Sequence, residues 1–108
     1  MTAGPAPADT ARVKARGDAP SNYRWSPDFQ HIIKGNKIAW KNTTTVTHHV
    51  VAYGGNWSYN NEVPAGESVR KRFRHTGAYK YRCDIPGHST LATDGTCDGM
   101  CGVIHVTS

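Results

Sequence analysis

The 108-residue sequence has no apolar run approaching the roughly 20 residues that a helix needs to cross a bilayer. Its first ten residues, MTAGPAPADT, lack the apolar stretch of a secretory signal peptide, and no window shows the 3.6-residue period of an amphipathic helix. We therefore expect no integral membrane segment. Residues 1–10 are interpreted as a flexible leader, left after removal of a signal, and residues 11–108 as a single domain.

Acidic residues are also scarce. The 8 Asp and Glu are outnumbered by 13 Lys and Arg, which gives a formal net charge of +5. Apart from the run RKRFR at 70–74, the basic residues are spread along the chain. Neither a continuous basic stripe nor a known nucleic-acid-binding module is present, so we expect no nucleic-acid partner. The positive charge would instead steer a partner with an acidic docking face toward this domain.

Turn residues recur along the chain, and β-branched or aromatic residues alternate with polar ones between them. About seven short segments of this kind predict an all-β fold, an antiparallel sandwich or barrel. The expected strands are residues 11–16, 29–33, 37–42, 47–53, 67–74, 77–83 and 102–107. The segment 54–66, GGNWSYNNEVPAG, is irregular in pattern, and no element is assigned to it.

Cysteine is rare, and all three cysteines lie in the last quarter of the chain, at Cys83, Cys97 and Cys101. Because the number is odd, a framework of disulfides alone cannot use every sulfur. In the segment GAYKYRC at 77–83, strand alternation places Tyr79, Tyr81 and Cys83 on one face, with the basic residues between them turned to water. Cys83 is therefore expected to point inward.

Soft metal ligands are concentrated in the same stretch. His88 follows Cys83 after a proline-glycine turn, and Met100 comes later. One thiolate, two imidazoles and a weak thioether form the trigonal ligand set of mononuclear copper electron-transfer sites. The sequence therefore favours a copper site, provided that a second histidine comes from another strand.

The segment THHVVAY at 47–53 offers two adjacent histidines for that role, which point to opposite faces of a strand. His48 shares its face with Val50 and Ala52, and this register favours His48 over His49. The remaining histidines have no partners at ligand spacing and are interpreted as ordinary surface or core residues: His31, His75 and His105.

Several segments, taken in order, resemble the cupredoxins, the type 1 blue copper family. They are YRWSPDFQHIIKGNKIAWKN, THHVVAY, VPAGESVRKRFRHTGAYKYRC, CDIPGH and GMCGVIHV, and together they span most of the chain from residue 23. The resemblance implies a Greek-key β-sandwich of about seven to eight strands. It also implies a soluble, monomeric electron-transfer protein, periplasmic or extracellular, that cycles one copper ion between Cu(I) and Cu(II).

The resemblance further implies that His48, Cys83 and His88 are the equatorial copper ligands and that Met100 is the axial one. The edge of His88 would then pass electrons to redox protein partners. Since all four positions would be filled, no open coordination site remains for a substrate, and we expect no enzymatic activity. The residue after the first histidine is often Asn in this family, but here it is His49, so its usual hydrogen bonds are not carried over.

The loop before Met100 departs from the family pattern. Eleven residues, STLATDGTCDG, separate it from His88, and a longer flexible loop costs more entropy to fix. A disulfide between Cys97 and Cys101 would fix Met100 at the end of this loop. Two readings stay open here: two free thiols in a reduced protein, or a structural zinc site built from Cys83, Cys97, Cys101 and a histidine.

Two other functions are compatible with an all-β domain of this kind. One is copper storage or delivery, and the other is a metal-free interaction domain with structural cysteines. Delivery proteins use exposed tracts rich in methionine and histidine, whereas this sequence has only two methionines, one of them at position 1. Electron transfer is therefore preferred.

Overall fold

The computed structural model describes residues 9–108, and within this range there are eleven strands and no helix. The all-β prediction is confirmed, and these residues include no helix able to cross a membrane. The leader proposed for residues 1–10 lies, up to residue 8, outside the described range. The strands are β1 (Thr10–Arg16), β2 (Arg24–Ser26), β3 (Phe29–Ile33), β4 (Lys37–Asn42), β5 (His48–Tyr53), β6 (Asn60–Val63), β7 (Ser68–Arg72), β8 (Gly77–Arg82), β9 (Ser89–Leu91), β10 (Cys97–Gly99) and β11 (Cys101–Thr107).

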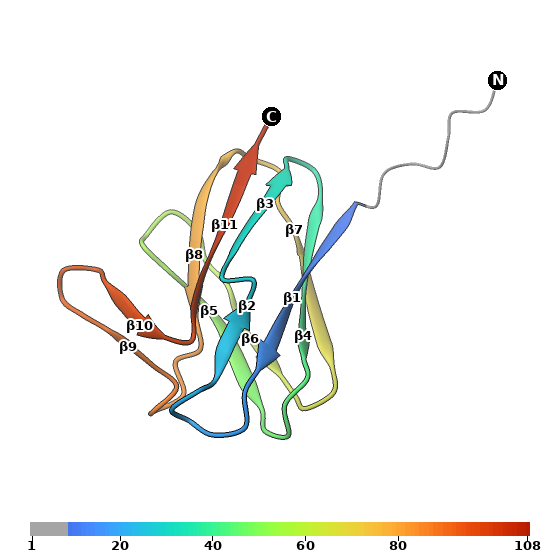
Figure 1. The fold of residues 1–108 in the computed structure, drawn as a ribbon. Coiled ribbons are helices and arrows are strands. Elements are labelled where there is room, and N and C mark those ends of the chain that lie inside the picture. Colours follow the sequence, from blue (N-terminus) through green and yellow to red (C-terminus); the bar gives the residue numbers. More distant parts are fainter. Residues whose placement is uncertain (1–8) are drawn as a thin grey trace.

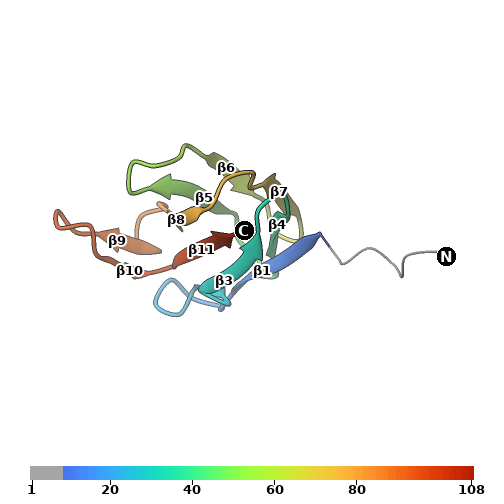
Figure 2. The same cartoon turned by 90° about the horizontal axis from the view of Figure 1, so that it is seen from above.

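Two sheets form a β-sandwich (Figures 1 and 2). One has the strand order β2-β1-β4-β7 and the other β3-β11-β8-β5-β6, while β9 and β10 form a separate hairpin that projects from one end (Figure 1). Most neighbouring strands are antiparallel, as predicted, but β1 pairs with β4 and β3 with β11 in parallel. Parallel neighbours need a crossover connection, and in both cases other strands lie between the partners in sequence.

All seven predicted segments form strands, and four further strands were not predicted. One of these, β6, lies in the segment 54–66 to which no element was assigned. Its sequence NNEV has low β propensity, and only Val63 is buried. It forms because it pairs with the edge of β5, where His48 lies opposite Val63. Tertiary pairing rather than local preference therefore creates this strand.

The core between the sheets is rich in aromatic residues. Trp25 and Trp40 come from one sheet and Tyr81 from the other, and each is at most 2% exposed. Tyr81 lies opposite Gly102 on the neighbouring strand, and a Cβ at Gly102 would come within 2.3 Å of the phenol ring. Glycine at this position therefore leaves the space that the Tyr81 side chain fills. Cys83 follows at the end of the same strand and is fully buried.

Candidate metal centre

Three side chains from separate segments converge at the end of the sandwich from which the β9–β10 hairpin projects. His48 begins β5, Cys83 follows β8, and His88 precedes β9. Nδ1 of His48 and Nδ1 of His88 are 3.2 Å apart, and Sγ of Cys83 lies 3.4 Å from the His88 nitrogen and 3.8 Å from the His48 nitrogen. All three residues are buried. Within residues 9–108 this is the one group of histidine, cysteine or acidic side chains with metal-ligand spacing.

These separations fit a metal ion bound in a trigonal plane. With bond lengths of about 2.1 Å to nitrogen and about 2.3 Å to sulfur, two nitrogens in such a plane lie roughly 3.6 Å apart, and nitrogen and sulfur roughly 3.8 Å. The observed separations of 3.2, 3.4 and 3.8 Å are close to these values. A soft thiolate beside two imidazoles is also the donor set of mononuclear copper sites. The residues present therefore fit copper in both spacing and chemistry.

Thr44 and Asn42 hold the His48 ring in position. Nε2 of His48 lies 2.8 Å from Oγ1 of Thr44, and that hydroxyl lies 2.7 Å from Oδ1 of Asn42. The amide oxygen can only accept, so the Thr44 hydroxyl donates to it and accepts from the Nε2–H of His48. This assigns the proton to Nε2 and leaves the Nδ1 lone pair facing Cys83 and His88. Asn42 is itself fixed, because its amide nitrogen donates to the carbonyls of Val46 and Val63.

Both imidazoles favour the neutral form that binds metals. Burial, followed by the charges of His88 and His49, lowers the pKa of His48 from 6.5 to about 4. Burial, followed by His49, also lowers the pKa of His88. A neutral imidazole keeps one nitrogen lone pair free, so the folded chain presents both rings as ligands at neutral pH.

The Cys83 sulfur receives a hydrogen bond from β5. The backbone N–H of His49 donates to Sγ across 3.3 Å. Burial raises the pKa of the Cys83 thiol. Hydrogen bonds from the backbones of His49 and Ile85 act in the opposite direction and offset this rise only in part. The ring of His49 reaches Asp84 at 3.0 Å and Glu62 at 3.8 Å. The position after the first histidine therefore contacts the cysteine loop here, through its backbone and through an imidazole–carboxylate pair.

Met100 is fully buried and belongs to the same core cluster as Cys83. Its backbone N–H donates to the carbonyl of His88 at 2.9 Å, and its carbonyl accepts from the N–H of Cys83 at 3.0 Å. Two backbone hydrogen bonds thus connect Met100 directly to Cys83 and to His88.

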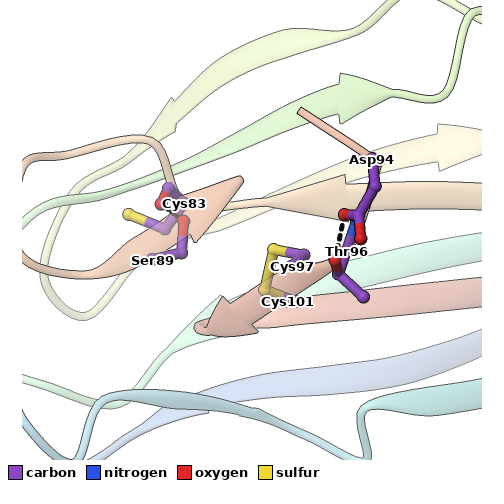
Figure 3. Close-up of a disulfide and its surroundings, with 6 residues drawn as sticks. All are labelled: Cys83, Ser89, Asp94, Thr96, Cys97 and Cys101. Carbon is purple, nitrogen blue, oxygen red and sulfur yellow. Dashed lines mark hydrogen bonds between the residues drawn. A yellow bond between two sulfur atoms is a disulfide. The ribbon is translucent and has the colours of Figure 1, made fainter. Parts of the chain in front are cut away.

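The long loop before Met100 is ordered by its own hairpin. Residues Ser89–Leu91 and Cys97–Gly99 pair as β9 and β10, with Gly99 opposite Ser89. The turn between them is closed by Asp94, whose carboxylate accepts hydrogen bonds from the N–H and hydroxyl of Thr96 (Figure 3). Cross-strand pairing therefore fixes the ends of this long loop, in addition to the predicted disulfide.

A disulfide joins Cys97 of β10 to Cys101 of β11, with 6.1 Å between their Cα atoms. Figure 3 shows the bridge set apart from Cys83, which is a buried free cysteine. This pairing was predicted and is present. A zinc site using all three cysteines is incompatible with it, and so are free thiols at Cys97 and Cys101.

Sequence reasoning missed Tyr23 as well as the Asn42–Thr44 support of His48. The Tyr23 ring lies 4.7 Å from the His48 ring and 4.8 Å from the His88 ring, centroid to centroid, and thus covers both. No sequence motif marks these three residues as neighbours of the site.

The remaining predicted non-ligand histidines lie elsewhere. His31 and His105 lie next to each other on β3 and β11, away from the centre, and His75 lies between β7 and β8.

A β-sandwich with one thiolate and two imidazoles brought together at one end has the architecture and the donor set of a mononuclear copper protein. The sequence profile of the copper-binding proteins of the plastocyanin/azurin family matches residues 11–107. The chain therefore belongs to this family of cupredoxins, and its cofactor is one copper ion.

Solved structures agree on the fold. A purple cupredoxin from Nitrosopumilus maritimus is 19% identical with a TM-score of 0.68, covering 90% of this chain and 99% of that one. Amicyanin from Paracoccus versutus is 18% identical with a TM-score of 0.68, covering 94% and 85%. A copper-containing nitrite reductase from Thermus scotoductus is 20% identical with a TM-score of 0.69, covering 92% of this chain but 22% of the enzyme. Curated protein sequences gave no match.

Proposed function

We propose that this domain is an electron carrier that cycles one copper ion between Cu(I) and Cu(II). In this proposal His48, Cys83 and His88 are the equatorial ligands and Met100 is the axial one. The observation that carries it is the convergence of Sγ of Cys83 with Nδ1 of both histidines inside a water-excluded core. The imidazoles suit both oxidation states and the thiolate suits Cu(I), so copper supplies one-electron chemistry here.

The protein keeps the ligands in place when the charge of the site changes. Thr44 and Asn42 fix the His48 ring, His49 donates to the Cys83 sulfur, and Met100 is hydrogen-bonded to both loop partners. Outer partners of this kind orient metal ligands and tune the metal. A site held in this way needs little rearrangement between the two oxidation states, which favours rapid electron transfer.

Electrons would enter or leave at the edge of His88. This residue is 8% exposed, whereas His48 is fully buried, so His88 is the imidazole that reaches the surface. It ends a short turn in which its N–H donates to the carbonyl of Ile85 at 2.9 Å, with exposed Pro86 and Gly87 between them. A redox protein partner that contacts this turn would lie next to the ligand ring.

With four protein ligands, the proposed site has no position for a substrate, so we infer a carrier rather than an enzyme. The Cys97–Cys101 disulfide favours an oxidising compartment, which supports a periplasmic or extracellular location. We also expect the domain to act as a monomer.

The test is a visible absorption spectrum and a metal analysis after adding one equivalent of Cu(II) to the purified protein. An intense thiolate-to-copper band is expected, and Cys83→Ser should abolish it. Cys97→Ser with Cys101→Ser should retain it, since those sulfurs are outside the site. Met100→Leu, which is similar in volume, should keep the copper but raise its reduction potential, because the axial thioether stabilises Cu(II).

A protein that binds copper without this band, or loses the metal readily to a chelator while exchanging electrons slowly, would contradict the proposal. The second result would instead identify a copper storage or delivery protein. An unchanged potential in Met100→Leu would remove Met100 from the ligand set without affecting the other three.

A further inference from the structure

Aromatic rings connect the metal centre to the interior of the sandwich without interruption. The ring centroid of Trp25 lies 6.3 Å from that of His48 and 5.8 Å from that of Tyr81. Tyr81 in turn lies 5.3 Å from Trp40, edge to face. These separations are within the range of direct contact between aromatic rings. The three central rings therefore form a continuous path from a proposed copper ligand into the core.

The path continues from Trp40 to the surface. Trp40 contacts Tyr59 at 5.5 Å and Phe73 at 6.4 Å. Trp57 stacks on Tyr59 at 5.8 Å with 10° between the ring planes, and lies 5.5 Å from Phe73. Tyr79 lies 5.0 Å from Phe73. Since Trp57 and Tyr79 are half-buried, the path ends in two rings that reach solvent.

Those two rings line a cavity of about 190 Å³, and basic side chains surround it. Lys71, Arg74 and His75 are among its lining residues, and no acidic residue is. The ammonium of Lys71 lies 5.6 Å from the centroid of Phe73, at cation–π distance. Lys71, Arg74 and His75 make no ion pair with any residue in the range 9–108. Arg72, also at the rim, is engaged by Asp9 and the Gly35 carbonyl.

This cavity lies far from the His88 turn. Most of its lining residues lie where β7 leads into β8, and Figure 1 draws this connection at the opposite end of the sandwich from the segment between β8 and β9, which holds Cys83 and His88. Its charge also differs, because Asp84 and its partner His49 lie beside Cys83 at the metal end. The two ends of the molecule therefore present different surfaces to a charged partner.

The central rings can bridge electron tunnelling without being oxidised or reduced themselves. Nε1 of Trp25, Nε1 of Trp40 and Oη of Tyr81 are buried and have no hydrogen-bond partner in the described part of the chain. With no neighbouring group to accept a proton, these rings act as a bridge for tunnelling and stay closed-shell.

We infer that the surface formed by Trp57, Lys71, Arg74, His75 and Tyr79, the remote basic face, is a second docking site for a redox protein. The partner it fits has an acidic docking face around a one-electron centre. This inference rests on the proposed electron-carrier function. In each event the copper site gives up or takes one electron, the partner's centre takes or gives it, and no bond or proton is exchanged.

The first experiment needs no copper. The ¹⁵N-labelled apo-protein is titrated with hexacyanochromate(III), a paramagnetic and redox-inert anion that broadens nearby amide signals. Broadening is expected at Trp57, at residues 71–75 and at Tyr79. The double variant Lys71→Gln, Arg74→Gln should abolish this broadening. The control variant Arg16→Gln, which removes an exposed positive charge at the end of β1, should not. Broadening confined to the His88 turn, or spread evenly, overturns the docking site.

The second experiment tests the path in the copper-loaded protein. Oxidation of the Cu(I) form by hexacyanoferrate(III) is followed by stopped flow and compared with oxidation by the cationic tris(phenanthroline)cobalt(III). Lys71→Gln with Arg74→Gln should slow the anionic oxidant by roughly two- to tenfold and reduce its salt dependence, with little effect on the cationic one. Trp57→Leu should slow the anionic oxidant while keeping the broadening by hexacyanochromate.

The outcomes separate the two proposals. Variants that keep an intact copper spectrum but oxidise at the wild-type rate overturn the remote path and leave the carrier function in place. Failure of the wild-type protein to form the thiolate–copper band would reject the carrier function, and the apo-protein titration would still report on the surface.

Discussion

The backbone N–H of Met100 donates to the carbonyl of His88 across 2.9 Å, although eleven residues lie between them. The β9–β10 hairpin accounts for this, since its paired strands begin just after His88 and end just before Met100. The Met100 carbonyl then accepts from Cys83 at 3.0 Å. Three of the four proposed ligand residues are therefore connected by backbone hydrogen bonds.

Gly99→Ala should disturb this arrangement more than any other glycine change in the hairpin. Gly99 has φ +94°, and a Cβ there would lie 2.6 Å from the His88 carbonyl oxygen, the acceptor for Met100. Gly95 has a similar φ of +92° but no atom within 4 Å of its Cβ position, which makes it a matched control.

We expect Gly95→Ala to cost about 1–2 kcal/mol through backbone strain alone. Gly99→Ala should cost more and should also shift the copper absorption band. Melting curves and spectra of the two variants make the comparison. Equal losses of stability with unchanged spectra would show that the close approach at Gly99 does not constrain the site.

Removing the disulfide should destabilise the protein modestly and leave the metal centre in place. The bridge from Cys97 to Cys101 closes a very short ring, for which loop entropy predicts at most about 2 kcal/mol. Hairpin pairing still fixes the ends of the loop when the bridge is absent. Chemical denaturation and copper titration of the double Cys97→Ser, Cys101→Ser variant would check this, and loss of copper binding would contradict it.

Thr44→Val should impair the site through His48 without changing the ligand set. The variant removes the hydroxyl between His48 Nε2 and Asn42 Oδ1, and leaves two buried polar atoms with one partner fewer. A loss of about 1–3 kcal/mol in stability is expected, with weaker copper binding. Thr45→Val is the control because Thr45 is exposed. If both variants bind copper equally well, the hydroxyl does not orient the ring.

The copper-free protein should lose stability in mild acid. The folded pKa of His48 is lowered to about 4, so between pH 6.5 and about 4 the unfolded chain binds more protons than the folded one. The free energy of unfolding therefore falls as the pH falls through this window, by up to about 3 kcal/mol from His48. His88, also lowered, adds to the same slope.

Urea denaturation of the apo-protein at several pH values measures this slope. It should be smaller in His48→Gln and unchanged in His75→Gln, where the ring is exposed. A flat profile in the wild-type apo-protein between pH 6.5 and 4.5 would contradict the expectation that the ring stays neutral.

The strands with strong alternation were predictable, because burial on one face leaves a period-2 pattern. The tyrosines before Cys83 are an example, and they placed that sulfur inside correctly. The parallel pairing of β1 with β4 was not predictable, since it depends on how the chain crosses between sheets. The same holds for β6, whose NNEV sequence becomes a strand only beside β5.

At the metal centre, the residue types predicted which side chains converge, whereas the residues that support them depend on topology. A thiolate and imidazoles are rare enough that Cys83 and His88 stand out at their spacing, and register selected His48. Tyr23 and Thr44, by contrast, are ordinary residue types in loops, and only the fold brings them against His48. The length of the segment before Met100 did not reveal that this segment pairs with itself as β9 and β10.

Because β9 and β10 pair with each other before the chain reaches Met100, the tip of this hairpin at residues 92–96 can be altered independently of the metal. A linker or recognition peptide placed there would extend away from the barrel while the ligand geometry stayed the same. The hairpin is thus a natural attachment point for wiring this domain to an electrode or to another protein.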